Sequence, residues 1–130
     1  MPKTGVNNRV FGNYGEDLAA EFLSSRGFKI IGRNLSYGPG ELDIVAQKGD
    51  ELHFIEVKTR FSDDFVSPLD AITDKKQRKM LLASECFLMD SSNTFDPDDP
   101  PPCFFDVIAI EQKEGGENIE LFEDVFQFEL

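Results

Sequence analysis

The chain has 130 residues, of which 40% are hydrophobic, so one domain with a core that needs no disulfide or metal staple is expected. It has no membrane-length apolar stretch, no apolar signal segment after Met1 and no metal-ligand spacing between its two cysteines, so we expect a cytoplasmic protein that does not enter a membrane. The net charge is −12, yet residues 1–60 carry eight basic and eight acidic side chains, while residues 91–130 carry one and eleven. This balance disfavours a broad phosphate-binding surface and leaves the N-terminal half as the candidate site for nucleic acid.

The first predicted element is a helix from about Asn13 to Ser25, and Arg26 and Gly27 form its expected end. Its apolar stripe consists of Leu18, Ala19, Phe22 and Leu23. Glu16 lies at the edge of this stripe, where its side chain can point toward a sheet. Residues 28–35 are predicted as a strand, and residues 36–40 (Ser-Tyr-Gly-Pro-Gly) as a turn.

The next two strands carry the most informative pattern in the chain. Residues 40–45 read Gly-Glu-Leu-Asp-Ile-Val, and residues 54–58 read Phe-Ile-Glu-Val-Lys. A hairpin turn at residues 49–50 sets a register in which Asp43 is opposite Glu56 and Glu41 is opposite Lys58. Two carboxylates on directly opposed residues repel each other unless a cation lies between them. The pattern therefore predicts a site for Mg²⁺ or Mn²⁺, with Lys58 supplying part of the positive charge.

The second half of the chain completes an α/β pattern. A short helical turn at residues 68–72 precedes a long helix, which Thr73 or Asp74 caps and which ends near Asp90. Residues 91–102 form a Pro-rich loop, residues 103–110 a buried strand, and residues 119–122 a short last strand before an acidic tail. The order α-β-β-β-α-β-β predicts a single domain over residues 1–130, with a mixed central sheet of about five strands and a helix on each face.

These motifs resemble those of the PD-(D/E)XK nuclease superfamily, whose core is restriction-endonuclease-like. Its signature is an Asp on one strand and Glu-x-Lys on the next, here Asp43 and Glu56-Val57-Lys58. More narrowly, the chain resembles the YraN-type family of uncharacterised bacterial proteins. The segments that carry this resemblance are residues 15–20, 27–28, 33–34, 40–45, 54–60, 76–78 and 105–107. The resemblance covers residues 12–110, and the Pro-rich loop and acidic tail depart from it.

The resemblance implies a metal-dependent nuclease that hydrolyses phosphodiester bonds in DNA or RNA, including branched or structured substrates. Asp43 and Glu56 would hold Mg²⁺ or Mn²⁺, and Lys58 would position the attacking water or help to deprotonate it. Holliday-junction resolvases of the same superfamily carry a glutamate in their first helix, which makes Glu16 a further candidate ligand and catalytic residue. Resolvase-like relatives pair, so a homodimer is also an expectation.

The candidate nucleic-acid contacts are the cations outside this centre and one amide. They are Arg33, Arg60, Lys75, Lys76, Gln77, Arg78 and Lys79. The run at residues 75–79 is equally interpreted as a solvated helix face.

The residues of the centre also have a structural interpretation. Asp43, Glu56 and Lys58 can form a surface ion pair on a solvated strand, and Glu16 can serve the helix dipole. Glu41 is interpreted as the cross-strand partner of Lys58. The alternative function is a catalytically inactive nucleic-acid-binding or protein adaptor module of the same fold, whose acidic C-terminal region faces a basic partner.

Overall fold

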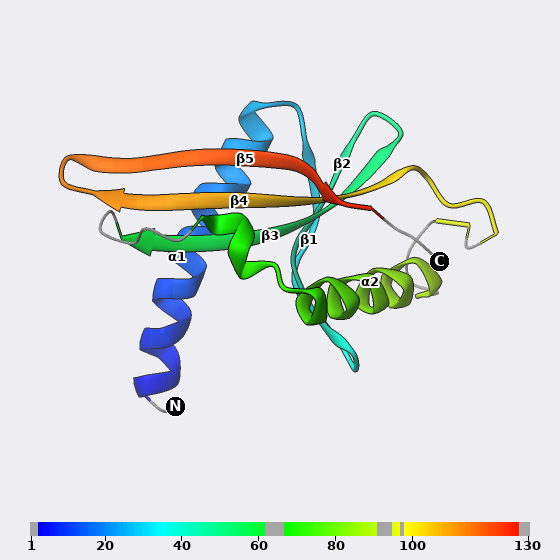
Figure 1. Cartoon of the computed structure of the whole chain (residues 1–130), viewed down its shortest axis with the longest axis horizontal. Coiled ribbons are helices and arrows are strands. Elements are labelled where there is room, and N and C mark those ends of the chain that lie inside the picture. The colour runs from blue at the N-terminus through cyan, green and yellow to red at the C-terminus, as the bar shows by residue number, and fades with distance from the viewer. Residues whose placement is uncertain (1–2, 62–66, 91–94, 97, 128–130) are drawn as a thin grey trace.

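The chain folds into a helix, three strands, a second helix and two further strands, in the order that the sequence predicts (Figure 1). The computed structural model describes the backbone of residues 3–61, 67–90, 95–96 and 98–127, and the side chains of residues 14–60, 67–70, 72–90, 95–96 and 98–127. The elements are α1 (Lys3–Ser25), β1 (Lys29–Tyr37), β2 (Gly40–Lys48), β3 (Glu51–Phe61), the 3₁₀ turn η1 (Pro68–Ala71), α2 (Asp74–Met89), β4 (Cys103–Lys113) and β5 (Gly116–Phe126). None of the described helices is long and apolar enough to cross a membrane.

The five strands form one mixed sheet in the order β1-β2-β3-β4-β5, which confirms the predicted α/β class. β3 and β4 are parallel because α2 carries the chain from the end of one to the start of the other. The remaining neighbours are antiparallel. Figure 1 shows β1 and β2 crossing steeply relative to β3, β4 and β5, as expected for a strongly twisted sheet.

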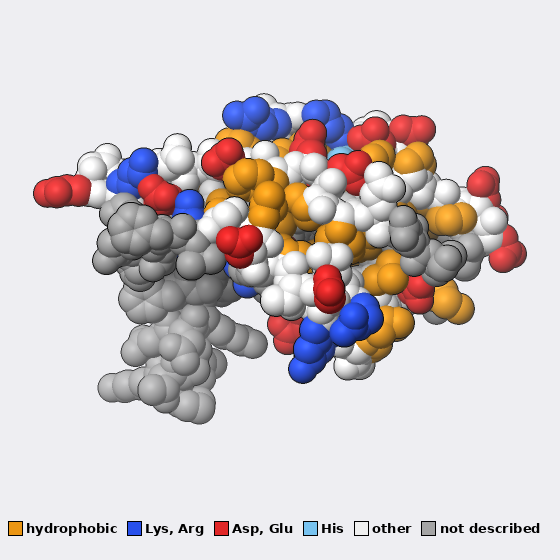
Figure 2. Space-filling view, viewed as in Figure 1, with side chains coloured by type: hydrophobic (Ala, Val, Ile, Leu, Met, Phe, Trp, Pro, Cys, Tyr) orange, Lys and Arg blue, Asp and Glu red, His pale blue; other side chains and the backbone are white. Residues whose placement is uncertain are grey.

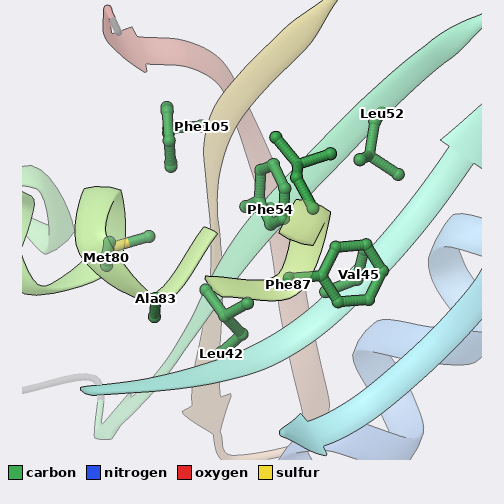
Figure 3. Packing of buried hydrophobic residues seen from close by; sticks show 9 residues of the cluster. Leu42, Val45, Leu52, Phe54, Met80, Ala83, Phe87 and Phe105 are labelled. Atoms are coloured by element: carbon green, nitrogen blue, oxygen red, sulfur yellow. The ribbon is translucent and has the colours of Figure 1, made fainter. Parts of the chain in front are cut away.

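Each face of the sheet has its own hydrophobic core and its own helix. The α2-side core is built from Leu42, Val45, Leu52, Phe54, Met80, Ala83, Phe87, Leu88 and Phe105 (Figure 3). The α1-side core is built from Ala19, Leu23, Phe28, Ile44, Ala46, Ile55, Ile108 and Ile110. Burying such side chains contributes about 1.5–3 kcal/mol each, so both helices are held firmly against the sheet. A site at the sheet is therefore flanked by a fixed helix on either side.

α2 begins where its cap predicts. Thr73 is extended, and its hydroxyl oxygen accepts a hydrogen bond from the Lys76 N–H at 3.2 Å. This cap satisfies a backbone donor that has no partner within the helix. It also fixes the first turn, and with it the origin of the Lys76 side chain.

Two element boundaries differ from the prediction. α1 begins at Lys3 rather than near Asn13, because an established helix gains one hydrogen bond for each added residue even where no apolar stripe continues. β5 runs from Gly116 to Phe126 rather than over residues 119–122, because β4 supplies its ladder partners whatever its apolar pattern. Much of the predicted acidic tail is thus strand. Residues 91–94, 97 and 128–130 of the predicted loop and tail lie outside the described residues.

Candidate active site

The pairing of β2 with β3 ends at the predicted site. The register agrees with the turn-based prediction from the hairpin as far as Ile44 and Ile55. The next pair in that register would be Asp43 and Glu56, but here the ladder stops. Instead, the Oδ2 atom of Asp43 accepts a hydrogen bond from the Val57 N–H at 2.9 Å. The Asp43 carboxylate therefore occupies the place where the two strands diverge.

A local change in β1 accompanies this divergence. Asn34 has a φ of 53°, a left-handed conformation that few residues other than Gly, Asn and Asp adopt readily. Asn34 is the position that faces Asp43 in the β1–β2 register. On either side of Asp43, Ile44 packs into the α1-side core and Leu42 into the α2-side core. β2 thus changes faces at Asp43, which places this carboxylate within reach of both sides of the sheet.

Glu56 approaches Asp43 from the α2 side. Its side chain is 6% exposed, and its Oε1 atom lies 3.4 Å from the Lys76 Nζ and 3.9 Å from the Lys58 Nζ. Burial, followed by the negative charge of Asp43, raises the pKa of Glu56 to about 7, although both lysines oppose the shift. The closeness of the two carboxyl groups favours a state in which one of them carries a proton. Such a pair accepts either a proton or a metal ion between its oxygens.

Glu16 approaches Asp43 from the α1 side. It is 8% exposed, and its Oε1 atom is buried without a hydrogen-bond partner in the part of the chain that the structure describes. Burial raises the pKa of Glu16, the charge of Asp43 adds to this, and a hydrogen bond with Asn34 opposes it. α1 lies very close to β3 here, since a Cβ atom added to Gly15 would be 2.5 Å from the Thr59 hydroxyl oxygen. Glu16 is thus held in place with one unused acceptor.

The donor set suits a small hard cation. Mg²⁺ and Mn²⁺ prefer oxygen ligands, and protein sites for Mg²⁺ commonly use only one or two carboxylates together with water and phosphate oxygens. Asp43 and Glu56 provide such a pair, and the unpartnered Glu16 oxygen provides a third acceptor near Asp43. No group of three His, Cys, Asp or Glu side chains within the described ranges forms a preassembled metal site. The residues therefore fit a cation that is bound partly by substrate and water.

Residues 15–110 match the model of a family described as uncharacterised protein family UPF0102. The chain belongs to this family. A UPF0102 protein of Symbiobacterium thermophilum is 39% identical over 109 residues, which cover 84% of this chain and 88% of that protein. One from Chlorobium phaeobacteroides is 38% identical over 126 residues, covering 92% and 95% of the two chains. These matches confirm the resemblance to the YraN-type family.

The region matched by the UPF0102 family contains the whole candidate site. It begins at Gly15, one residue before Glu16, and it includes the diverging strands and the first turn of α2. It ends within β4, so β5 and the acidic β4–β5 turn lie beyond it. The site thus belongs to the part of the molecule that defines the family.

Two of the predicted nucleic-acid contacts, Arg33 and Arg60, lie apart from the Asp43–Glu56 pair. Arg33 forms an ion pair with Asp17 at 2.7 Å on the α1 side, next to Glu16. Arg60 lies 3.3 Å from Glu111 of β4, further along β3.

The prediction that Glu41 faces Lys58 is wrong. Because β2 leaves β3 after Ile44, Glu41 is opposite Ser36 of β1, and Lys58 is opposite Ala109 of β4.

The basic run of α2 divides into two parts. Lys76 reaches Glu56, whereas Lys75, Arg78 and Lys79 are exposed. The Gln77 amide donates a hydrogen bond to the Ile72 carbonyl at 3.2 Å, and Gln77 and Arg78 line a separate cavity of about 240 Å³ at the end of β5. On the face shown in Figure 2, Lys and Arg side chains form separate groups with acidic side chains between them. That face presents no continuous basic surface.

His53 belongs to a different, α1-side cluster. Its Nδ1 atom lies 2.6 Å from the Asp106 Oδ2, and its Nε2 atom lies 3.0 Å from the Glu51 Oε1. Burial lowers the pKa of His53, but the hydrogen bonds and charges of Asp106 and Glu51 outweigh burial and raise it overall. The Asp106 Oδ1 also accepts the Asp124 N–H at 2.9 Å, so this cluster ties β3 to the irregular end of β5.

Sequence reasoning missed two features of the site. The first is Asn34, which has a left-handed backbone beside Asp43 and whose side chain interacts with Glu16. Its signal was the residue type, because Asn tolerates this conformation in the middle of a strand pattern. The second is the contact of Lys76 with Glu56, which depends on how α2 packs and has no local signal.

Proposed function

We propose that this protein is a metal-dependent nuclease that hydrolyses phosphodiester bonds in DNA or RNA. The observation that supports the proposal most strongly is the pair of mutually repelling carboxylates, Asp43 and Glu56, beside two lysines at a break in the strand pairing. A purely structural role explains this arrangement poorly, because exposed ion pairs contribute little to stability and would not require two repelling carboxylates, of which Glu56 is buried. A raised carboxyl pKa beside specific charged partners is instead typical of functional sites.

In this proposal, Asp43 and Glu56 hold Mg²⁺ or Mn²⁺, and Glu16 contributes through its unpartnered oxygen. When bound, the ion would supply positive charge for the phosphate oxygens and would lower the pKa of an attacking water. The Val57 N–H fixes the orientation of the Asp43 carboxylate through the 2.9 Å hydrogen bond. Lys58 has a side chain that is 35% exposed, so its ammonium group can contact both the water and the developing negative charge on the phosphate.

A second candidate is a catalytically inactive adaptor of the same fold. Two observations favour it: the net charge of −12 and the absence of three preassembled ligands among the residues that the structure describes. A protein that grips a duplex through many phosphates is usually basic. The proposed nuclease would therefore contact only a short stretch of nucleic acid, or act on it together with a partner.

The deciding experiment measures metal binding and cleavage in the same samples. Calorimetric titration with Mn²⁺ should show saturable binding that is lost in Asp43→Asn, which keeps the shape and removes the charge. Branched, flapped and single-stranded DNA and RNA should be cut by the wild type and left intact by Asp43→Asn. Asp17→Asn is the matched control, because Asp17 pairs with Arg33 on the exposed side of α1 and should leave metal binding unchanged.

The results separate the two candidates. If the wild-type protein binds nucleic acid but no divalent ion promotes cleavage of any substrate, the adaptor function is correct. If Asp43→Asn cuts as fast as the wild type, the nuclease proposal is wrong about its central residue.

A further inference from the structure

The closest described cation to Glu56 is not the lysine of the Glu-x-Lys motif. Lys76 reaches across from the first turn of α2, and its Nζ lies 3.4 Å from the Glu56 Oε1, compared with 3.9 Å for Lys58. The Lys76 side chain is 35% exposed, so its ammonium group lies at the boundary between the buried carboxylate and solvent. Lys76 is thus positioned as a cation beside the carboxylate that the proposed metal would use.

A metal ion bound at Glu56 and the Lys76 ammonium group would repel each other. A metal ion bound to a carboxylate oxygen lies about 2.0–2.1 Å from it, and an ammonium group 3.4 Å from the same oxygen would then feel strong repulsion. Lys76 can move away at little cost, because a long, partly exposed side chain has many solvated rotamers. Glu56 cannot move as easily, since only 6% of its side chain is exposed. Metal binding should therefore displace the lysine and leave the carboxylate in place.

We propose that Lys76 is a positioning residue that occupies the Glu56 carboxylate in the metal-free protein and is displaced by the metal ion. The inference rests on the proposed function, because it assumes that Asp43 and Glu56 bind a divalent ion. Before binding, Lys76 compensates the repulsion between Glu56 and Asp43. After binding, its ammonium group is free a few ångströms from the site, where the phosphate of a substrate would lie. Lys76 would thus stabilise the metal-free site and, once the metal is bound, contribute to substrate binding.

The first test follows Lys76 directly in the full-length protein, without substrate. Lysines are labelled by reductive ¹³C-methylation, which keeps their charge, and their resonances are recorded during titration with Mg²⁺. The Lys76 resonance, assigned with Lys76→Arg, should shift with the same midpoint as calorimetric binding. Lys75 is the matched control, since it is exposed one residue away and pairs with none of the described acidic residues, and its resonance should stay in place.

The second test measures metal affinity after the lysine charge is removed. Lys76→Met keeps the length and apolar stem, and it should bind Mg²⁺ about fivefold more tightly than the wild type because the competing charge is gone. Lys75→Met should bind as the wild type does. At saturating metal, Lys76→Met should cut with a raised KM and a nearly unchanged kcat, and Lys76→Arg should restore KM.

The outcomes separate this inference from the proposed function. If Mg²⁺ binds and the Lys76 resonance does not move, or Lys76→Met binds Mg²⁺ no more tightly, the proposed displacement of Lys76 is wrong and the nuclease proposal is unaffected. If the resonance moves with metal but no substrate is cut, the displacement of Lys76 is supported and the catalytic proposal fails. If Mg²⁺ does not bind, both are overturned.

Discussion

Glu56→Gln should make the protein more stable above neutral pH while it abolishes metal binding. In the folded protein, burial and the charge of Asp43 raise the pKa of Glu56 from 4.5 to about 7. A carboxyl group with a raised folded pKa stabilises the fold while it is protonated. Stability is therefore lost as the pH rises from 4.5 through about 7. Glutamine has the shape of the protonated acid and has no charge to lose.

The size of this effect follows from the shift. Each pKa unit corresponds to about 1.4 kcal/mol, so a shift from 4.5 to about 7 amounts to about 3 kcal/mol above pH 7. Lys58 and Lys76 lose a partner in the variant, but both are partly exposed and can be solvated instead. For a domain of 130 residues, that free energy corresponds to a rise in Tm of roughly 11 °C.

The assay is urea unfolding of wild type and Glu56→Gln across the pH range from about 5 to 9, without divalent ions. The difference in the free energy of unfolding should be smallest at the acidic end and should increasingly favour the variant toward the basic end. Glu41→Gln is the matched control, because Glu41 is exposed and should give a flat difference. A variant that is less stable than the wild type at every pH would refute the reasoning, since Glu56 would then be a net stabilising partner of the lysines.

Three further predictions concern the elements that hold the site. Gly15→Ala should lower the free energy of unfolding by about 1–3 kcal/mol despite the better helix propensity of Ala, and Thr59→Ala in the same chain should restore it, as denaturant melts would show. Asp106→Asn should cost about 3–5 kcal/mol at acidic pH, because it breaks the buried pair with His53. That cost should shrink as the pH rises from about 6.5 through the raised pKa of His53, and a pH-independent cost would contradict an ionised pair. Thr73→Ala should cost about 1 kcal/mol by removing the cap of α2, measured by thermal unfolding, and an unchanged Tm would show that the cap is dispensable.

The sequence predicted the order of the elements because their patterns are local. The alternation in β2 and β3, the Gly49 turn and the Thr73 cap each act within a few residues. The register of the hairpin was therefore correct as far as Ile44. The parallel pairing of β3 and β4 followed from the intervening helix.

The details of the site depended on tertiary structure and could not be predicted in the same way. A register counted from a turn assumes that pairing continues along both strands. Here β2 and β3 stop pairing after Ile44, next to Asp43 and the left-handed Asn34. The partner assigned to Glu41 was wrong for this reason. The closeness of Lys76 to Glu56 depends on the docking of α2 against the α2-side core, which no short-range pattern encodes.

The change of face at Asp43 has a consequence for how the candidate site is assembled during folding. Its three carboxylates come from α1, β2 and β3, and the lysines from β3 and α2, so no contiguous fragment contains the centre. Either helix can leave the sheet only by exposing one of the two cores. A partly folded chain therefore lacks the assembled carboxylates, and in the proposed nuclease only molecules in which both helices are packed on the sheet would bind the metal ion.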